Sequence, residues 1–233
     1  MKTIGLLGGM SWESTVSYYQ IINKEVRERL GGLHSAKILL CSVDFQQIEA
    51  WQRQGEWEKA GQYCAQQAAM LCKAGADCIV LCTNTMHVIA PIIEAAIDVP
   101  FLHIVDSTAA AIKRQGLHKV GFLGTRFSME RPFFKDRLRS QCGVDVLLPN
   151  VEDREKVHRI IFDELCCGEI LETSKQFFCD VIQKLATQGA EGIILGCTEI
   201  PLLIKPEDAS VPLFDTAELH AKSACDWALA DVA

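Results

Sequence analysis

The chain has 233 residues, of which 49% are hydrophobic and 23% charged, and its formal net charge is −7 at pH 7. The length allows one large domain or two small ones, and the composition is ordinary for a globular protein. The negative charge argues against nucleic-acid binding, which needs clustered Lys and Arg. No stretch approaches the ~18 uninterrupted apolar residues of a membrane span, and MKTIGLLGGM lacks the apolar core of a signal peptide. We therefore expect a cytoplasmic protein without a membrane partner.

Short apolar runs alternate with longer helical stretches along the whole chain. Strands are predicted at residues 3–8, 36–43, 78–82, 100–105, 119–124, 144–148, 192–196 and 211–214. Helices are expected between them, for example over 11–30 and 175–188. Strands this apolar that alternate with helices indicate parallel sheets covered on both faces, so we predict an α/β fold.

The second half of the sequence repeats the first. Three pairs of matching residues occur in the same order: Gly5 and Gly121, Gly75 and Gly189, Val99 and Val211. A duplication predicts two pseudo-symmetric lobes, each with a mainly parallel sheet flanked by helices. We expect an N-terminal lobe of residues 1–105 with 216–233, and a C-terminal lobe of residues 106–215. Because ligands bind outside the carboxyl ends of parallel strands, we expect the active site in the cleft between the lobes.

The repeat also compares two strand ends, CTNTMH and GCTEIP. In this alignment Thr83 falls on Cys197, and Cys82 falls on Gly196. Successive side chains of a strand point to opposite sides. If Cys197 faces the cleft, Thr83 does so too, and Cys82 points into the core of its lobe. We therefore predict Thr83 and Cys197 as the catalytic pair.

Two groups on opposite sides of one carbon suit proton abstraction on one face and proton return on the other, which is racemisation or epimerisation. A thiolate is a suitable base because the thiol pKa of ~8.5 falls further beside a helix N-terminus. The strand-to-helix turns also direct backbone N–H groups and helix dipoles toward a ligand, which favours carboxylates. A small dicarboxylate is therefore the expected kind of substrate.

Neither the cysteines nor the first glycine turn carries a cofactor signature. There are eleven cysteines, none in a C-x-x-C pair and most in apolar runs, which indicates reduced thiols that fill the core rather than zinc ligands. The turn GLLGG lacks the G-x-G-x-x-G spacing of a dinucleotide site. We expect no cofactor and no metal ion.

The sequence closely resembles the aspartate/glutamate racemases, which need no pyridoxal phosphate, essentially from end to end. The motifs that carry the resemblance are GLLGGMSWEST (5–15), CTNTMH (82–87), FLGTRFSM (122–129) and LGCTEI (195–200), with RIIFDELCCG (159–168) as a looser match. The resemblance implies two α/β lobes, a homodimer and a catalytic pair drawn from the second and fourth motifs. The residues that it implies in substrate binding are Met10, Gln52, Asn84, Thr85, Thr125, Thr198 and Glu199.

Several neighbouring residues have more than one interpretation. His87 could orient the Thr83 hydroxyl, donate to a carboxylate, cap a helix or belong to the core. Glu199 could raise the basicity of a nearby group or cap the following turn. Asp44 is expected to cap a helix, although it could also touch the cleft. Trp12, Trp51 and Trp57 could line the pocket, but packing is the expected role.

One position departs from the family pattern, which has a cysteine where this chain has Thr83. A hydroxyl is far less acidic than a thiol. In the related racemases, the thiol that removes the α-proton from the L-enantiomer corresponds to Cys197. The expected function is racemisation of aspartate or glutamate with a kinetic preference for the L-enantiomer. Two alternatives stay open: a related one-thiol decarboxylase or isomerase of small dicarboxylates, and a catalytically silent amino-acid-binding protein. The sequence does not rank aspartate against glutamate.

Overall fold

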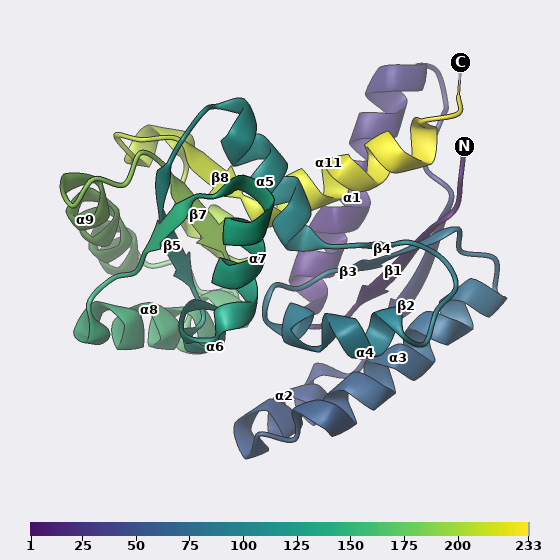
Figure 1. The fold of residues 1–233 in the computed structure, drawn as a ribbon, viewed down its shortest axis with the longest axis horizontal. Helices are drawn as coiled ribbons and strands as arrows, with labels where there is room; N and C mark the ends of the chain where they lie inside the picture. The colour runs from purple at the N-terminus through teal and green to yellow at the C-terminus, as the bar shows by residue number, and fades with distance from the viewer. Residues whose placement is uncertain (233) are drawn as a thin grey trace. The chain divides into compact units, whose positions relative to one another are not determined.

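The computed structural model describes residues 1–232, which form two units connected by two chain crossings (Figure 1). The first unit contains residues 1–104 and the chain from residue 220 onward, and the second contains residues 105–219. The lobes predicted from the sequence, 1–105 with 216–233 and 106–215, stay a prediction. Residue 233 lies outside the described part of the chain.

The first unit is built on a parallel sheet with the strand order β2-β1-β3-β4. Its strands are β1 (Ile4–Gly8), β2 (Ile38–Ser42), β3 (Cys78–Leu81) and β4 (Phe101–Leu102). Its helices are α1 (Trp12–Leu30), α2 (Phe45–Gln54), α3 (Trp57–Lys73), the 3-10 helix η1 (Thr85–Ile89), α4 (Ala90–Glu94) and most of α11 (Thr216–Leu229). The central strands β1 and β3 are buried along their whole length, because helices cover both faces of the sheet.

The second unit has a parallel sheet with the order β6-β5-β7-β8. Its strands are β5 (Lys119–Gly124), β6 (Asp145–Leu147), β7 (Ile193–Gly196) and β8 (Leu213–Asp215). Its helices are α5 (Ile104–Arg114), α6 (Arg126–Glu130), α7 (Pro132–Cys142), α8 (Val151–Asp163), η2 (Leu165–Cys167), α9 (Glu172–Thr187), α10 (Ile200–Leu203) and η3 (Pro206–Asp208). β7 is fully buried, and β5 is buried except at its first residue.

The two units share one topology, which confirms the predicted α/β class with two parallel sheets flanked by helices. In each unit a glycine with a positive φ lies in the turn before one of the two central strands, which is β3 in the first unit and β7 in the second. Gly75 has a φ of 100° before β3, and Gly189 has a φ of 96° before β7. L side chains rarely adopt this conformation, so the matching glycines of the sequence repeat serve the same turn in both units.

Strand β4 is the element that differs most from its prediction. The sequence predicts a strand over 100–105, but β4 pairs with β3 only at Phe101 and Leu102, and α5 begins at Ile104. The backbone N–H of Ile104 donates to the ring of His87, 17 positions earlier. The predicted extension of this strand to residue 105 is therefore wrong. Local β propensity contains no information about a hydrogen bond with a side chain 17 positions away.

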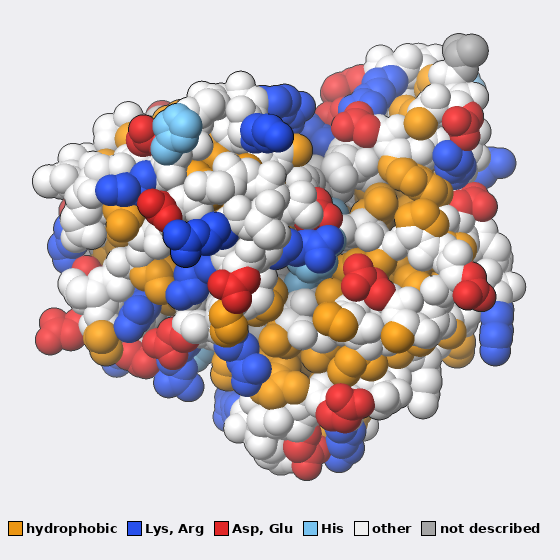
Figure 2. Space-filling view, in the orientation of Figure 1, with side chains coloured by type: hydrophobic (Ala, Val, Ile, Leu, Met, Phe, Trp, Pro, Cys, Tyr) orange, Lys and Arg blue, Asp and Glu red, His pale blue; other side chains and the backbone are white. Residues whose placement is uncertain are grey.

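The surface of the protein carries charges of both signs. On the face shown in Figure 2, Lys and Arg side chains are interspersed with Asp and Glu. This distribution differs from the clustered basic patch of a nucleic-acid-binding surface. Among residues 1–232, no helix is long and apolar enough to cross a membrane, and no three His, Cys, Asp or Glu side chains are placed to hold a metal ion.

Candidate functional site

The chain leaves β3 through Cys82 and Thr83, whose surroundings differ. Cys82 is fully buried, with its Sγ 3.8 Å from the carbonyl oxygen of Val80, and burial raises the pKa of this thiol. Thr83 is 8% exposed. Its N–H donates to the carbonyl oxygen of Leu81 at 2.9 Å, the i to i+2 pattern of a γ-turn at a strand end. The thiol thus belongs to the core, whereas the hydroxyl lies where the strand ends.

The second unit shows why position 82 faces the core. Gly196 corresponds to Cys82 and ends β7, and a Cβ built on it would lie 1.8 Å from the ring of Phe122. Position 196 therefore points at a packed aromatic ring, and alternation sends the side chain of Cys197 to the opposite side. The same alternation applies to Cys82 and Thr83, and the full burial of Cys82 agrees with it.

His87 holds the backbone of Thr83. The ring Nδ1 of His87 lies 2.7 Å from the carbonyl oxygen of Thr83, so this contact is made with the backbone rather than with the hydroxyl. The ring is buried and lies 4.5 Å, centroid to centroid, from the ring of His103. The spacing of four residues was the only sequence signal for this pair, and it did not indicate which atom of Thr83 is contacted.

The other predicted residues of the first unit lie around the same end of the sheet. Asn84 and Thr85 are buried directly after Thr83, where η1 begins. Met10 is buried just after β1, the strand that pairs with β3. Gln52 is buried on α2, and its Nε2 lies 3.0 Å from the Sδ of Met86 in η1. Sequence reasoning did not identify Met86, because only the folded chain brings α2 against η1.

Two of the open interpretations are now decided by contacts. Asp44 caps α2, because its carboxylate accepts the backbone N–H of Gln46 at 3.1 Å. Trp51 is buried in the core and Trp57 packs against that core, as expected, but Trp12 is 64% exposed, so packing within the chain is wrong for Trp12. Trp12 lies near the start of α1 on its outward side.

At the end of β7, a carboxylate organises the predicted residues. Cys197 is 7% exposed, and its Sγ donates to Oε2 of Glu199 at 3.0 Å. The hydroxyl of Thr198 donates to the same oxygen at 2.8 Å. Glu199 is itself buried, so one carboxylate holds both the thiol and the neighbouring hydroxyl.

The pKa of Cys197 is raised, not lowered as the sequence suggested. Burial is the main cause, followed by the charge of Glu199. The following helix α10 has only four residues, so its dipole is too short to offset these effects. In the free protein the thiol form is therefore favoured, with its proton directed at the Glu199 carboxylate.

Thr125 lies at the end of β5, the strand next to β7. It caps α6: its Oγ1 accepts the backbone N–H of Ser128 at 3.2 Å and lies 3.1 Å from the Ser128 hydroxyl. Each unit thus brings its own predicted residues to the carboxyl ends of its two central strands. In chemical terms, one end offers a hydroxyl and amides, and the other a thiol with a carboxylate beside it.

The remaining thiols are consistent with the core role predicted for most cysteines. All eleven cysteines are free. Burial raises the pKa of Cys64, Cys78 and Cys225 to about 12 in each case. Cys167 is exposed and is an exception to the core interpretation.

The known proteins to which this chain is similar include racemases and racemase homologues. The family model for Asp/Glu/hydantoin racemases matches residues 7–224. A solved structure of a candidate Asp/Glu racemase from Yersinia pestis is 55% identical with a TM-score of 0.93, and the match covers 98% of this chain and 100% of that one. A solved aspartate racemase homologue from Pyrococcus horikoshii is 34% identical with a TM-score of 0.85, over 98% and 99% of the two chains. A broad-specificity amino-acid racemase from Bacillus subtilis is 28% identical over 163 residues, 70% of each protein.

Proposed function

The chain belongs to the Asp/Glu/hydantoin racemase family, and we propose that it racemises aspartate or glutamate without a cofactor, with a kinetic preference for the L-enantiomer. The observation that carries this proposal is the pair of equivalent strand ends. One ends in Thr83 and the other in Cys197, which donates to a buried carboxylate. Racemase activity agrees with the family and with the amino-acid racemase to which the chain is similar.

In this proposal Cys197 removes the α-proton of the L-substrate. Its thiol proton first passes to Glu199, whose Oε2 is 3.0 Å away. The α-ammonium group of a bound substrate would favour the thiolate by supplying a positive charge, which opposes the effects that raise the thiol pKa in the free protein. Thr83 then gives its hydroxyl proton to the opposite face of the α-carbon and regains a proton from solvent. Asn84, Thr85 and Thr198 are proposed to bind the carboxylate and amino groups.

The preference for the L-enantiomer follows from the different acidities of the two groups. Starting from the D-enantiomer, Thr83 would have to act as the base, and an alkoxide forms far less readily than a thiolate. The equilibrium constant between enantiomers is one, so the difference is kinetic. With an equilibrium constant of one, the Haldane relation makes kcat/KM equal in the two directions, so the preference must appear in kcat, with KM differing by the same factor. Initial rates at saturating concentrations of each pure enantiomer of aspartate and glutamate test this directly, and equal kcat values for the two directions would contradict the proposal.

A one-thiol reaction is the second candidate, because the complete burial of Cys82 leaves Cys197 as the thiol at the ends of β3 and β7. Incubation with L-glutamate or L-aspartate in D₂O separates the possibilities. Deuterium at the α-carbon together with D-product indicates racemisation. Exchange without D-product indicates that Cys197 acts alone, and binding without exchange indicates a silent amino-acid-binding protein. Loss of carbon dioxide from a small dicarboxylate would indicate a decarboxylase.

We further propose that the protein is a homodimer. The outward side of α1 carries Trp12, Val16 and Tyr19 at helical spacing, and they are 64%, 42% and 52% exposed. A stripe of large apolar side chains suits contact with a second copy of the chain. Sedimentation should give the mass of a dimer, and Trp12→Glu should shift it to a monomer; a wild-type monomer would contradict the proposal. A cytoplasmic location stays a prediction.

A further inference from the structure

The two ring nitrogens of His87 have partners that determine its protonation. Nδ1 lies 2.7 Å from the carbonyl oxygen of Thr83, which can only accept a hydrogen bond. Nε2 receives the backbone N–H of Ile104 at 3.2 Å, which can only donate. These two partners fit a neutral ring with its proton on Nδ1, since a proton on Nε2 would face the amide hydrogen of Ile104.

His87 lies in a buried group of aromatic rings. Its ring centroid is 4.5 Å from that of His103, 5.5 Å from that of Phe101 and 5.7 Å from that of His220. His87 is 1% exposed, and His220 is fully buried. The ring is thus fixed by packing as well as by its two hydrogen bonds, so it does not rotate freely to exchange partners.

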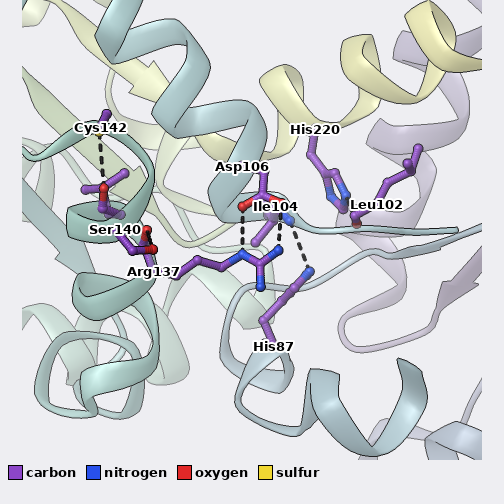
Figure 3. Close-up of polar contacts among 9 residues, drawn as sticks. His87, Leu102, Ile104, Asp106, Arg137, Ser140, Cys142 and His220 are labelled. Atoms are coloured by element: carbon purple, nitrogen blue, oxygen red, sulfur yellow. Dashed lines mark hydrogen bonds and ion pairs between the residues drawn. The ribbon is translucent and has the colours of Figure 1, made fainter. Parts of the chain in front are cut away.

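The partners of His87 lie where the chain passes between the units. Ile104 is the last residue of the first unit before the crossing, and His220 is the first residue after the return. His220 donates from Nε2 to the carbonyl oxygen of Leu102 at 2.7 Å, while its Nδ1 lies 2.9 Å from the hydroxyl of Tyr18. Figure 3 shows the two histidines reaching the segment 102–104 from opposite sides. They supply hydrogen bonds that the two-residue strand β4 is too short to provide.

From Ile104 the chain continues directly into α5, whose first turn is bound by a side chain of α7. Asp106, in the first turn of α5, is bound by Arg137 of α7 through two hydrogen bonds, Nε to Oδ1 at 2.6 Å and Nη2 to Oδ2 at 2.7 Å (Figure 3). A bidentate pair of this kind fixes orientation as well as distance. Residues 102–106, which we call the crossing segment, are therefore held by side chains at both ends.

We propose that His87 is a positioning residue that couples Thr83 to the crossing segment. One nitrogen fixes the carbonyl group of Thr83, and the other fixes the amide where the chain departs for the second unit. His87 does not touch the reacting atoms in this role. Its contribution to catalysis, which rests on the proposed function, is to hold the Thr83 hydroxyl in the position from which it returns a proton.

A matched pair of substitutions separates the two contacts. The amide of His87→Asn reaches about as far as Nδ1 and can still donate to Thr83, whereas the amide of His87→Gln reaches about as far as Nε2 and can still accept from Ile104. Each variant leaves one buried group without its partner, so their melting temperatures should fall by similar amounts. Tyr18→Phe serves as a control that disturbs the same ring group at His220 without touching Thr83.

The readout is the ratio of D-product formation to α-deuterium exchange from L-glutamate in D₂O. Exchange at one face needs only Cys197, whereas D-product also needs Thr83. We expect His87→Gln to lower this ratio roughly tenfold, the effect of losing one buried hydrogen bond, and His87→Asn to lower it by a smaller factor because the anchor at Ile104 is lost, whereas Tyr18→Phe leaves it nearly unchanged. A purely structural role would lower both rates together in all three variants, and that result would overturn the proposal.

Nitrogen NMR of histidine-labelled protein tests the geometry without activity. The two-bond correlations of a neutral ring identify which nitrogen carries the proton, and the His87 signal is recognised by its loss in His87→Asn. We expect the Nδ1–H tautomer near neutral pH; the Nε2–H tautomer or a charged ring would overturn the proposal. A wild-type protein that neither racemises nor exchanges would refute the proposed function, and the tautomer would still decide whether His87 holds Thr83 to the crossing segment.

Discussion

The ends of β3 and β7 occupy equivalent positions in the two units, but their backbones are held in different ways. The carbonyl oxygen of Thr83 accepts a hydrogen bond from the side chain of His87, whereas that of Cys197 accepts the backbone N–H of Ile200 at 3.3 Å. In the repeat, His87 corresponds to Pro201, which has no comparable donor. The end of β3 therefore depends on the side chain of His87, four residues later, whereas the end of β7 is closed by the backbone of its own next turn.

The two ends also differ in the proton acceptor beside the reactive group. Glu199 accepts from both Cys197 and Thr198, and its counterpart in the first unit is Thr85, which has no carboxylate. A thiol with a carboxylate can be converted into a base, but a hydroxyl without one cannot be deprotonated as readily. The two groups thus keep equivalent positions in the repeat but differ in acidity and in the acceptor beside them, and this difference underlies the proposed preference for the L-enantiomer.

The largest expected effect comes from removing the thiol at the end of β7. Cys197→Ala should lower both racemisation and α-deuterium exchange of L-glutamate by about 10³-fold or more, the scale of a lost general base. Mass spectrometry of the recovered substrate measures both. A variant that keeps its exchange rate would show that Cys197 is not the base.

The next largest effect is expected from placing a thiol at the end of β3, as at the end of β7. Thr83→Cys should raise kcat from the D-enantiomer, measured at saturating substrate, by between ten- and a hundredfold, because a thiolate then becomes available on the second face. Initial rates from pure D- and L-glutamate measure the change, and Thr83→Ser is the control that keeps a hydroxyl. An unchanged D-rate in Thr83→Cys would contradict the equivalence of positions 83 and 197.

A smaller effect is expected from neutralising the carboxylate that distinguishes the β7 end. The negative charge of Glu199 raises the pKa of the Cys197 thiol, so Glu199→Gln should lower this pKa. Alkylation of Cys197 by iodoacetamide should consequently reach its thiolate plateau at lower pH than in the wild type. Racemisation should nevertheless slow, because the acceptor of the thiol proton is gone. Glu207→Gln, an exposed position in η3, should change neither quantity.

The smallest effect is expected at the neighbouring thiol of the β3 end. Cys82→Ala removes a fully buried side chain and should cost roughly 1 kcal/mol of unfolding free energy, measured by urea denaturation. Both directions of racemisation should keep their rates, because Cys82 faces the core. A strong loss of activity at unchanged stability would mean that Cys82, rather than Thr83, acts on the substrate.

Much of the fold could be read from local patterns. The strand predicted at 119–124 matches β5 in full, and the helix predicted at 11–30 differs from α1 by one residue, because apolar strands and amphipathic helices have distinct periodicities. Prediction failed where a tertiary contact competes with propensity. The strand predicted to residue 105 ends at Leu102, whose carbonyl oxygen is bound by His220, and the amide of Ile104 beyond it is bound by His87.

The sequence by itself determined the two-sheet α/β plan, the internal repeat and the equivalence of Thr83 with Cys197, because these follow from periodicity and from the order of residues along the chain. Only the tertiary structure decided the surroundings of those two side chains. Burial raises the pKa of Cys197, Glu199 accepts a hydrogen bond from its thiol, and His87 contacts both the Thr83 carbonyl and the amide of Ile104. Such properties depend on which atoms exclude water from a group or supply it with a hydrogen bond in the folded chain, and that is set by packing rather than by the periodicity of the sequence.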